Sequence, residues 1–519
     1  MFKLFFFAFV SGILLTLAYP RFSFWPIAAV AVVPYLCCLI TNAKNFSWRQ
    51  VYLSAFVLGA VWHLSSIWWM AYVTFWGMFV LSLFLAFLFA IFITLGWFLV
   101  KKDVHPALAF VSAWLAFEAT ITYCFTGFPW LILGYSLRPL IPIIQISDIA
   151  GVYAVSFLIL LINLGIALFM VGIVQRTSFV KRVRTLVFAS VLFIAFFVYG
   201  LWKINLLEGE SPDASVNVAC IQANIPTEIK HDRSKNSVFL NKYKMLTLDA
   251  AKNDPDLIIW PETAIPGYFF EYGLSYTTVT SIVNRIKIPL LTGLSRYELN
   301  ENQKYEFYNS AALISPNSYV VPLYDKMHLV MFGEYVPLEK YIPFLKLVTP
   351  IPGSYSSGRQ PQLIGLKLSN RTVNFGSLIC FEDVFGYLSR RMARKGADIL
   401  VNLTNDGWFR SSPQAFQHAA IAAFRAIETR RPLIRSTNSG ITTIINRLGK
   451  TQKVLHKEDK YTEVSGILHG KVNIFKSRQT IYTKFGDWFL IFWVAVVILL
   501  IMLCISRSGL KMENPKIAK

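Results

Sequence analysis

The stretch VNFGSLICFE, residues 373–382, decides the fold class of the polar half of this 519-residue chain. Apolar and β-branched residues lead into Cys380, and Glu382 stands two positions after it. This pattern predicts a buried strand over 373–380 that ends in a polar turn. Because α/β folds often present reactive side chains where strands end, Cys380 is a candidate nucleophile.

Similar apolar runs alternate with helix-compatible segments along the region from about 207 to 484. The alternation predicts a layered sheet with helices packed on it, and the region is long enough to bury its own core. The predicted strands cover 216–225, 256–260, 288–295, 309–315, 373–380 and 397–404, and the predicted helices cover 238–251, 387–395 and 416–430.

Two more polar residues complete a candidate catalytic set with Cys380. Glu262 follows the strand-like run DLIIW, and Lys326 lies in YDKMHLVMFGEYVP. A cysteine attacks as its thiolate, a glutamate can take the thiol proton, and an ammonium group can stabilise the negative oxygen that forms during attack. These three groups suffice for acyl transfer through a thioester. Taken alone, each has a commoner explanation as a core cysteine, a capping glutamate or a surface lysine.

Together, and in this order, the three residues lie in motifs that resemble those of the nitrilase superfamily. The motifs are WPETA (260–264), DKMHLVMFGEYVP (325–337) and LICFEDVF (378–385). The resemblance extends over about 216–475 and implies an αββα sandwich. It also implies Glu262 as general base, Lys326 as the residue that stabilises the oxyanion, and Cys380 as nucleophile.

The same resemblance implies supporting residues around this set. Glu334 would hold Lys326 or assist proton transfer. Asn309 would contribute hydrogen bonds from behind the site. Glu382 and Phe381 would shape the wall beside the nucleophile.

The chain as a whole has the composition of a membrane protein, since 55% of its residues are apolar and its mean hydropathy is +0.50. A helix needs about 20 apolar residues to cross a bilayer core of about 30 Å. We predict about eight such helices, of which the first two are short and could be tilted or re-entrant. Their approximate spans are 4–17, 26–40, 51–70, 73–100, 106–122, 152–174, 186–202 and 488–505.

The net charge of the chain is +21, and the positions of its basic residues test the orientation of these spans, because cytoplasmic loops are enriched in Lys and Arg. With a cytoplasmic N-terminus, the basic loops near 44–49, 101–102 and 176–184 and the basic tail all fall on one side. Topology therefore explains part of the charge, and no nucleic-acid-binding motif is recognised. Seven crossings before the polar region and one after it place that region outside the cytoplasm.

The predicted architecture is an α-helical transmembrane bundle with an extracytoplasmic α/β domain of the nitrilase-like αββα type. Its predicted parts are an N-terminal bundle over 1–206, a catalytic domain over 216–475, a C-terminal membrane helix over 486–506 and a cytoplasmic tail over 507–519.

Motifs along nearly the whole chain resemble the apolipoprotein N-acyltransferase family. They are FPWLILGYS (128–136), IQANIP (221–226), FGEYVP (332–337), TNDGWF (404–409), STNSGIT (436–442) and RQTIYTKFGDW (478–488). The resemblance implies a multi-pass protein of the bacterial inner membrane. It also implies that a fatty acyl chain passes from a phospholipid, through a thioester on Cys380, to the α-amino group of the diacylglyceryl-cysteine that begins a lipoprotein.

Two histidines lie close to these motifs. His231 stands about where the family often has a tryptophan, so it either packs against the substrate or is a solvated loop residue. His328, near Lys326, is interpreted as structural. The six cysteines are scattered without metal-ligand spacing, and no metal or organic cofactor is implied.

A lipid substrate favours a site held against the bilayer, where a two-tailed molecule is concentrated and oriented. The apolar stretch 337–358 is therefore interpreted as an arm at the membrane surface, with ordinary packing onto the domain as an equal alternative. Two rival functions remain. One is a membrane-tethered amidase or nitrilase-type hydrolase, and the other is a transporter or scaffold, for which Glu118 and Asp148 are the candidate intramembrane charges.

Overall fold

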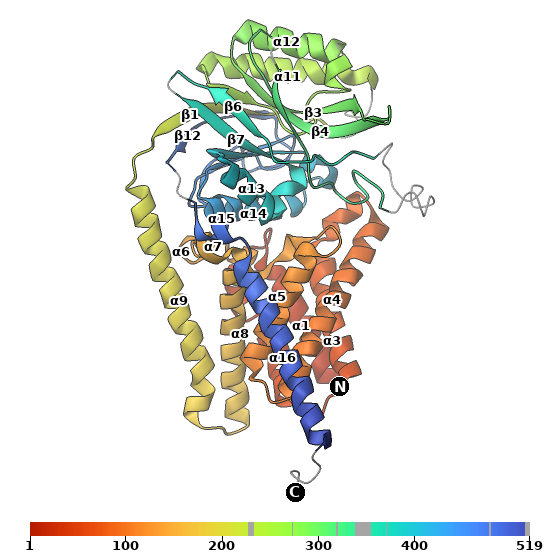
Figure 1. Cartoon of the computed structure of the whole chain (residues 1–519), viewed down its shortest axis with the longest axis vertical. Coiled ribbons are helices and arrows are strands. Elements are labelled where there is room, and N and C mark those ends of the chain that lie inside the picture. The colour runs from red at the N-terminus through yellow and green to blue at the C-terminus, as the bar shows by residue number, and fades with distance from the viewer. Residues whose placement is uncertain are drawn as a thin grey trace. The chain divides into compact units, whose positions relative to one another are not determined.

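The structure is a computed structural model, shown in Figure 1. It describes residues 1–226, 233–271, 273–317, 320–337, 354–369, 371–476 and 479–513. Backbone contacts divide the chain into two units. The helical unit comprises Met1–Asn205 and Phe485–Lys519, and the α/β unit comprises Leu206–Lys484.

The described residues of the α/β unit form two six-stranded sheets. In the first sheet, β1, β2 and β3 pair in parallel, and the flanking strands pair antiparallel. Its order is β12 (Gly466–Ile474), β1 (Ala214–Gln222), β2 (Leu257–Ile259), β3 (Leu290–Leu299), β4 (Tyr305–Ile314) and β5 (Val320–Asp325).

The second sheet has the same plan, with a parallel centre of β7, β8 and β9 and antiparallel edges. Its order is β11 (Thr451–Val454), β10 (Thr443–Ile445), β9 (Leu433–Thr437), β8 (Ile399–Thr404), β7 (Thr372–Ile379) and β6 (Leu363–Lys367). All residues of β8 and β9 are buried, as expected for parallel strands covered on both faces.

Four helices cover the outer faces of the two sheets, which pack against each other (Figure 1). Helices α11 (Asn236–Ala250) and α12 (Leu274–Ile286) lie on the first sheet. Helices α13 (Gly386–Lys395) and α14 (Gln414–Thr429) lie on the second. The predicted αββα sandwich is confirmed.

The six predicted strands correspond to β1, β2, β3, β4, β7 and β8, and the three predicted helices to α11, α13 and α14. The sequence patterns did not reveal β5, β6, β9 to β12 or α12. Several of these strands are short, and β11 is exposed and polar, so they lack a continuous apolar run.

The helical unit has a helix at each predicted membrane span. These are α1 (Phe2–Ala18), α2 (Val33–Thr41), α3 (Trp48–Ser66), α4 (Phe75–Lys101), α5 (Pro106–Tyr123), α8 (Val152–Val174), α9 (Phe179–Glu208) and α16 (Trp488–Glu513). The span predicted over 26–40 is not one helix, because a short 3₁₀ turn, Trp25–Ala29, precedes α2. The helix predicted over 186–202 is longer at both ends.

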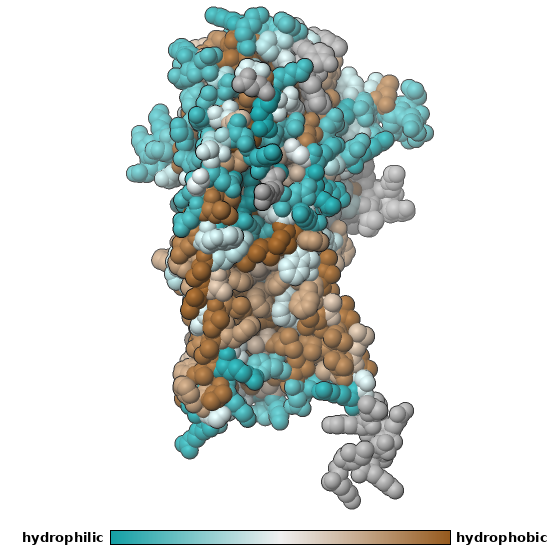
Figure 2. Space-filling view, turned by 60° about the vertical axis from the view of Figure 1, so that its left-hand side comes forward, coloured by the Kyte–Doolittle hydropathy of each residue, from teal (hydrophilic) through white to brown (hydrophobic). Residues whose placement is uncertain are grey.

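Within the described residues, four helices are long and apolar enough to cross a membrane, namely α4, α8, α9 and α16. The face drawn in Figure 2 shows these apolar side chains as a brown surface over the helices. On these helices, large apolar residues such as Phe79, Val187 and Leu499 are exposed, as expected for side chains in contact with lipid. The count of eight crossings and the outward side of the α/β unit stay proposals.

A buried segment, residues 129–137, consists of two short 3₁₀ turns, Pro129–Leu131 and Leu133–Leu137, in the helical unit. Side chains from the end of α1, from α5 and from α8 hydrogen-bond its backbone groups, as an apolar environment requires. The Tyr19 hydroxyl donates to the Leu131 carbonyl at 2.9 Å, and the Leu133 N–H donates to Glu118 Oε1 at 3.0 Å. Glu118, a candidate transport charge, therefore has a structural role. The other candidate, Asp148, accepts a hydrogen bond from Tyr199 at 2.7 Å.

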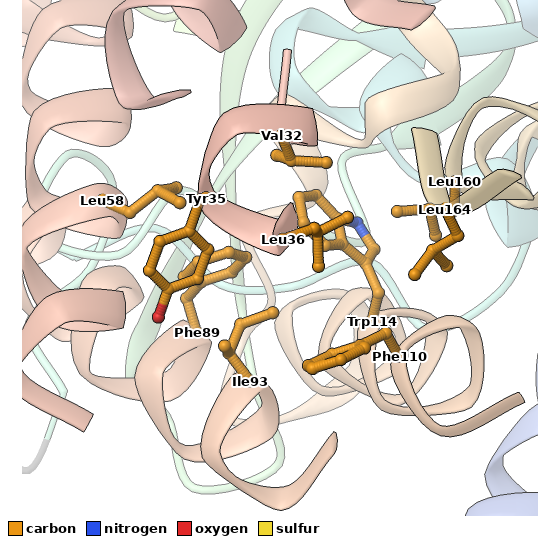
Figure 3. A pocket seen from close by; sticks show the side chains of 10 residues that line it. All are labelled: Val32, Tyr35, Leu36, Leu58, Phe89, Ile93, Phe110, Trp114, Leu160 and Leu164. Atoms are coloured by element: carbon orange, nitrogen blue, oxygen red, sulfur yellow. The ribbon is translucent and has the colours of Figure 1, made fainter. Parts of the chain in front are cut away.

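A small apolar cavity lies among α2, α3, α4, α5 and α8 (Figure 3). Its lining is aliphatic and aromatic, and includes Leu36, Phe89, Trp114 and Leu164. The Tyr35 hydroxyl hydrogen-bonds with Ser54 at 3.0 Å. A cavity with this lining is expected to stay dry, because a water molecule needs polar partners.

Candidate active site

Cys380 lies at the turn where β7 passes into a 3₁₀ helix, η9 (Cys380–Val384). Its φ of +52° is in the left-handed region, which a residue with a side chain seldom adopts without support. The Asn402 side chain donates to the Cys380 carbonyl at 2.9 Å, and the Ile379 N–H donates to Glu382 Oε2 at 2.8 Å. These bonds hold a sharp turn on which Cys380 is half-buried.

Glu262 is placed by a buried tryptophan two residues earlier. Trp260 is fully buried, its ring lies 4.6 Å from that of Tyr243 on α11, and its indole N–H donates to Thr247 at 2.9 Å. The following backbone is pressed against β3, where a Cβ on Gly293 would lie 2.6 Å from the Glu262 Cα. Only glycine fits that position without displacing Glu262.

Lys326 follows β5 and lies between two carboxylates. Its Nζ is 2.8 Å from Glu334 Oε1 and 3.6 Å from Glu262 Oε1. The Asn309 amide joins the same two groups, donating to Glu262 at 2.8 Å and to Glu334 at 3.0 Å. The Val330 N–H donates to the other Glu334 oxygen at 2.9 Å. Glu334 thus holds both the ammonium group and the loop that follows it.

The charges of the site act on one another. Burial alone would lower the pKa of Lys326, but the carboxylates of Glu334 and Glu262 outweigh it and raise that pKa. Lys326 is therefore a fixed cation and not a proton acceptor. Burial and the charge of Glu262 raise the pKa of the Cys380 thiol, while Lys326 lowers it. The thiol needs a base at the moment of attack, and Glu262 is the carboxylate whose charge acts most on it.

Glu382 is fully buried and links the two loops that carry Lys326 and Cys380. Besides Ile379, its carboxyl group accepts hydrogen bonds from the Met327 N–H at 2.8 Å, the His328 N–H at 3.0 Å and the Tyr324 hydroxyl at 2.8 Å. Burial raises the pKa of Glu382 to about 7, although these donors oppose the rise. Glu382 supports the wall of the site from behind and does not line it.

The structure also places the other residues that the sequence pointed to. Phe381 lies beside Phe385, with ring centroids 5.2 Å apart. The His328 ring lies 3.8 Å from that of Phe385 and hydrogen-bonds with the Tyr387 hydroxyl at 2.9 Å, which suits the structural interpretation. His231 and residues 338–353 of the predicted arm lie outside the described residues.

The end of the predicted arm, residues 354–358, binds the catalytic loop directly. The Tyr355 N–H donates to the Glu334 carbonyl, and the Gly358 N–H donates to the Lys326 carbonyl, each at 2.8 Å. A Cβ on Gly358 would overlap the Asp325 carbonyl oxygen. The backbone beside Lys326 therefore depends on this segment.

Sequence reasoning missed a buried ionic cluster behind Cys380, formed by Asp383, Asp406, His418 and Arg435. The side chains of these four residues are at most 2% exposed, and the cluster is linked by ion pairs of 2.7–3.1 Å. The missed signal was Arg435, which follows the apolar pair Leu433 and Ile434 in β9, because a charged residue inside a buried strand needs partners.

Comparisons with known proteins agree with this fold. Residues 217–467 match the family model described as carbon-nitrogen hydrolase. Residues 11–165 match the model of the apolipoprotein N-acyltransferase N-terminal domain. The α/β unit is thus a carbon-nitrogen hydrolase domain of the nitrilase superfamily.

Relatives extend the match to nearly the whole chain. Apolipoprotein N-acyltransferase of Geobacter metallireducens is 34% identical over 498 residues, which cover 93% of this chain and 91% of that protein. The enzyme of the same name from Chlorobaculum tepidum is 30% identical, with 93% of each chain covered. The chain belongs to the apolipoprotein N-acyltransferase family. It is therefore an acyltransferase, and the hydrolase alternative is not favoured.

Solved structures with similar folds are more distant. Saccharomyces cerevisiae Nit3, a member of the nitrilase superfamily, is 18% identical with a TM-score of 0.38, and the match covers 50% of this chain and 91% of that one. An amidase from Nesterenkonia sp. is 18% identical with a TM-score of 0.36, over 53% and 94% of the two chains.

Proposed function

We propose that this chain moves a fatty acyl group from a phospholipid to the amino terminus of a diacylated lipoprotein, with Cys380 as the carrier. In the first half-reaction Glu262 takes the thiol proton, and the sulfur attacks the ester carbonyl of the lipid. Lys326 stabilises the negative oxygen of the tetrahedral intermediate. The intermediate collapses to a thioester, and Glu262 returns its proton to the departing lysophospholipid alcohol.

The second half-reaction uses the same groups in the reverse direction. The α-amino group of the N-terminal diacylglyceryl-cysteine attacks the thioester, and Glu262 takes the proton that the amine loses. The amide forms as the sulfur leaves, and the proton returns to the Cys380 sulfur. The covalent intermediate divides one difficult transfer into two easier steps.

The observation that carries this proposal is the placement of one buried ammonium group beside two carboxylates. Lys326 is 1% exposed, and its two partners lie 2.8 and 3.6 Å away. A cation in these surroundings keeps its proton, so it can serve repeatedly as the electrostatic partner of an oxyanion. Supporting roles follow from contact: Glu334 and Asn309 hold this pair, and Glu382 with Phe381 supports the turn beside the thiol.

The lipid donor fits the apolar helical unit. We place the N-terminus in the cytoplasm, eight crossings in the bacterial inner membrane and the catalytic domain, residues 216–475, on the outer side. The basic loops near 44–49, 101–102 and 176–184 then face the cytoplasm. A cysteine introduced by Lys457→Cys should react with an impermeant maleimide in intact cells, and one introduced by Lys102→Cys should react only after permeabilisation. The opposite result would reverse the topology.

The thioester provides the decisive test. Purified chain in detergent is mixed with a phospholipid carrying a labelled fatty acyl chain, and Cys380 is examined by mass spectrometry. We expect the acyl mass on Cys380, its disappearance when a synthetic diacylated lipopeptide is added, and a triacylated product. Cys380→Ser should lack thioester and product, whereas Cys124→Ser, at an exposed cysteine, should retain both. Release of free fatty acid without transfer to the lipopeptide would instead establish a hydrolase.

A further inference from the structure

The buried ionic cluster of Asp383, Asp406, His418 and Arg435 has a geometry that ordinary core packing does not require. The Arg435 guanidinium binds both carboxylates, with Nη1 at 2.9 Å from Asp383 and Nη2 at 2.8 Å from Asp406. The His418 ring lies between the same two carboxylates, 2.7 Å from Asp383 and 3.1 Å from Asp406. Two carboxylates therefore share two nitrogen groups in a site closed to solvent, where charges interact strongly.

This cluster reaches Cys380 by two routes. Asp383 lies in the same 3₁₀ turn, three residues after Cys380. Arg435 Nη1 also donates to Asn402 Oδ1 at 3.0 Å, and the Asn402 amide in turn donates to the Cys380 carbonyl. The charge of Asp406, moreover, contributes to raising the pKa of the thiol. The cluster is connected to the nucleophile by hydrogen bonds and by its electric field.

The hydrogen bonds of His418 can be satisfied in two protonation states. Arg435 Nη2 lies 2.6 Å from His418 Nδ1, and because a guanidinium only donates, that contact requires an unprotonated Nδ1. The proton then sits on Nε2 and is donated to Asp383. In the charged ring, the Nδ1–H donates to Asp406 Oδ1, so Arg435 Nη2 must move away from Nδ1 while it keeps its bond to the other oxygen of Asp406.

The two states differ by one charge behind the nucleophile. Two carboxylates and one guanidinium give the cluster a net charge of −1 with a neutral imidazole and 0 with an imidazolium. The groups that face the ring are Asp383 from η9, Asp406 from η10 (Asp406–Phe409), Arg435 from β9 and Gln414 from its own helix. Burial and Arg435 would lower the pKa of His418, but Asp383 and Asp406 outweigh them and raise it.

We propose that His418, with Asp383, Asp406 and Arg435, positions Cys380 and tunes its thiol by gaining or losing one proton. The charged ring cancels the excess negative charge and makes the thiolate easier to form, whereas the neutral ring makes it harder. His418 is a positioning residue, since it acts on the sulfur through its neighbours. The inference rests on the proposed role of Cys380 as the nucleophile, but the test below measures the thiol itself and does not require acyl transfer.

The test is the pH dependence of thiol alkylation in the full-length protein in detergent. Iodoacetamide is uncharged, and mass spectrometry separates the Cys380 peptide from those of the other cysteines. For the wild type, we plot the logarithm of the rate of Cys380 alkylation against pH. The points should follow two parallel lines of unit slope, with a step from one line to the other near the pKa of His418. The line on the acid side should lie about tenfold higher, the effect of one buried charge at roughly 10 Å.

Three variants make the outcome decisive. His418→Gln should remove the step and leave the slower line at every pH. Asp406→Asn removes a negative charge and should accelerate alkylation about tenfold. Asp398→Asn is the matched control, because Asp398 accepts a hydrogen bond from the Asn374 N–H, six residues before Cys380 at the other end of β7, and should leave the profile unchanged. Thermal melting checks that each variant is folded.

Two results would overturn the proposal. A step that survives in His418→Gln would belong to another group, such as Glu262. Slower alkylation in both His418→Gln and Asp406→Asn would show that the cluster only supports the structure, since a structural role predicts loss in both variants and not opposite changes.

Discussion

The two sheets of the α/β unit contribute different things to one site. The first sheet contributes Glu262, Asn309 and Lys326, which hydrogen-bond or pair with one another at the edge of the site. The second contributes Cys380 and, behind it, Asn402 and the buried ionic cluster. The difference teaches that one sheet holds the ionised groups that face Cys380 across the site, while the other holds Cys380 itself and the buried cluster behind it.

Glu382 connects the two sheets through hydrogen bonds. Its carboxyl group binds the backbone of Met327 and His328, which follow the first sheet, and of Ile379, which ends β7 in the second. A shift of either sheet would therefore be transmitted to the other through one buried side chain. Substitutions in the first sheet, at Glu382 and at glycines beside the site should therefore have distinct effects on acylation, stability and thiol alkylation.

The largest effect is expected from the first sheet. Lys326→Met removes the cation proposed to stabilise the oxyanion and should lower the rate of lipopeptide acylation by about 10²–10³-fold. Glu262→Gln removes the proposed proton acceptor and should lower that rate by about 10²–10⁴-fold. Both rates are measured with the purified protein at saturating phospholipid. Lys252→Met, which removes an exposed lysine paired with Asp249, is the control and should change little.

These two variants also test the division between the sheets. If Lys326 and Glu262 act on substrate and proton transfer alone, neither variant should abolish the pH step in thiol alkylation that is assigned to His418. Loss of that step in Lys326→Met would show that the two sheets do not work as separate layers.

A smaller effect on acylation is expected from a substitution at Glu382. Glu382→Gln keeps the shape but presents N–H donors to some of the backbone N–H groups that Glu382 accepts from, so acylation should fall by about 10–100-fold. The pH dependence of stability has a defined sign. Because the pKa of Glu382 is raised from 4.5 to about 7, the folded state holds its proton more tightly than the unfolded state does.

The stabilisation that comes from protonated Glu382 is therefore fully present below about pH 4.5 and is lost as the pH rises through 7. The melting temperature of the wild type, compared with that of Glu382→Gln, should show its greatest advantage near pH 5 and a smaller one near pH 8. An advantage that grows with pH would mean that Glu382 is ionised throughout this range.

The sequence predicted Glu262, Lys326 and Cys380 better than the buried ionic cluster behind them. Glu262 and Cys380 stand at the ends of predicted strands, and Lys326 lies with them in motifs that resemble a known family, so the sequence predicted that the three residues act together. The structure brings these residues together with Glu334, Asn309 and Glu382, while their chemical roles stay proposals. The motif TNDGWF contained Asp406, but nothing in the sequence pairs it with Arg435, because that contact depends on the parallel register of β8 and β9.

The strands of the fold differ in the same way: some can be predicted from their own residues, and others only from the strands with which they pair. Central strands such as β8 are continuous apolar runs, and such runs are visible in one sequence. By contrast, β5 contains Pro322 and β11 is polar and exposed, so both are defined by pairing with a neighbour and not by composition. The role of His418 could not be predicted for a similar reason. A histidine on a predicted helix gives no sign that its partners, Asp383 and Asp406, lie on two different turns.

The smallest effect is expected when either of two glycines is replaced by alanine. Gly293 lies against the backbone of Glu262, and Gly440 lies against the side chain of Asp406. In Gly293→Ala the new Cβ would lie 2.6 Å from the Glu262 Cα, and in Gly440→Ala it would overlap the Asp406 carboxylate. Each crowding should cost about 1–3 kcal/mol of stability. Gly293→Ala should lower acylation several-fold and leave the pH step in thiol alkylation in place, and Gly440→Ala should alter that step. Gly273→Ala, where no atom lies within 4 Å of the new Cβ, is the matched control. Identical alkylation profiles in all three variants would show that the buried ionic cluster does not reach the thiol.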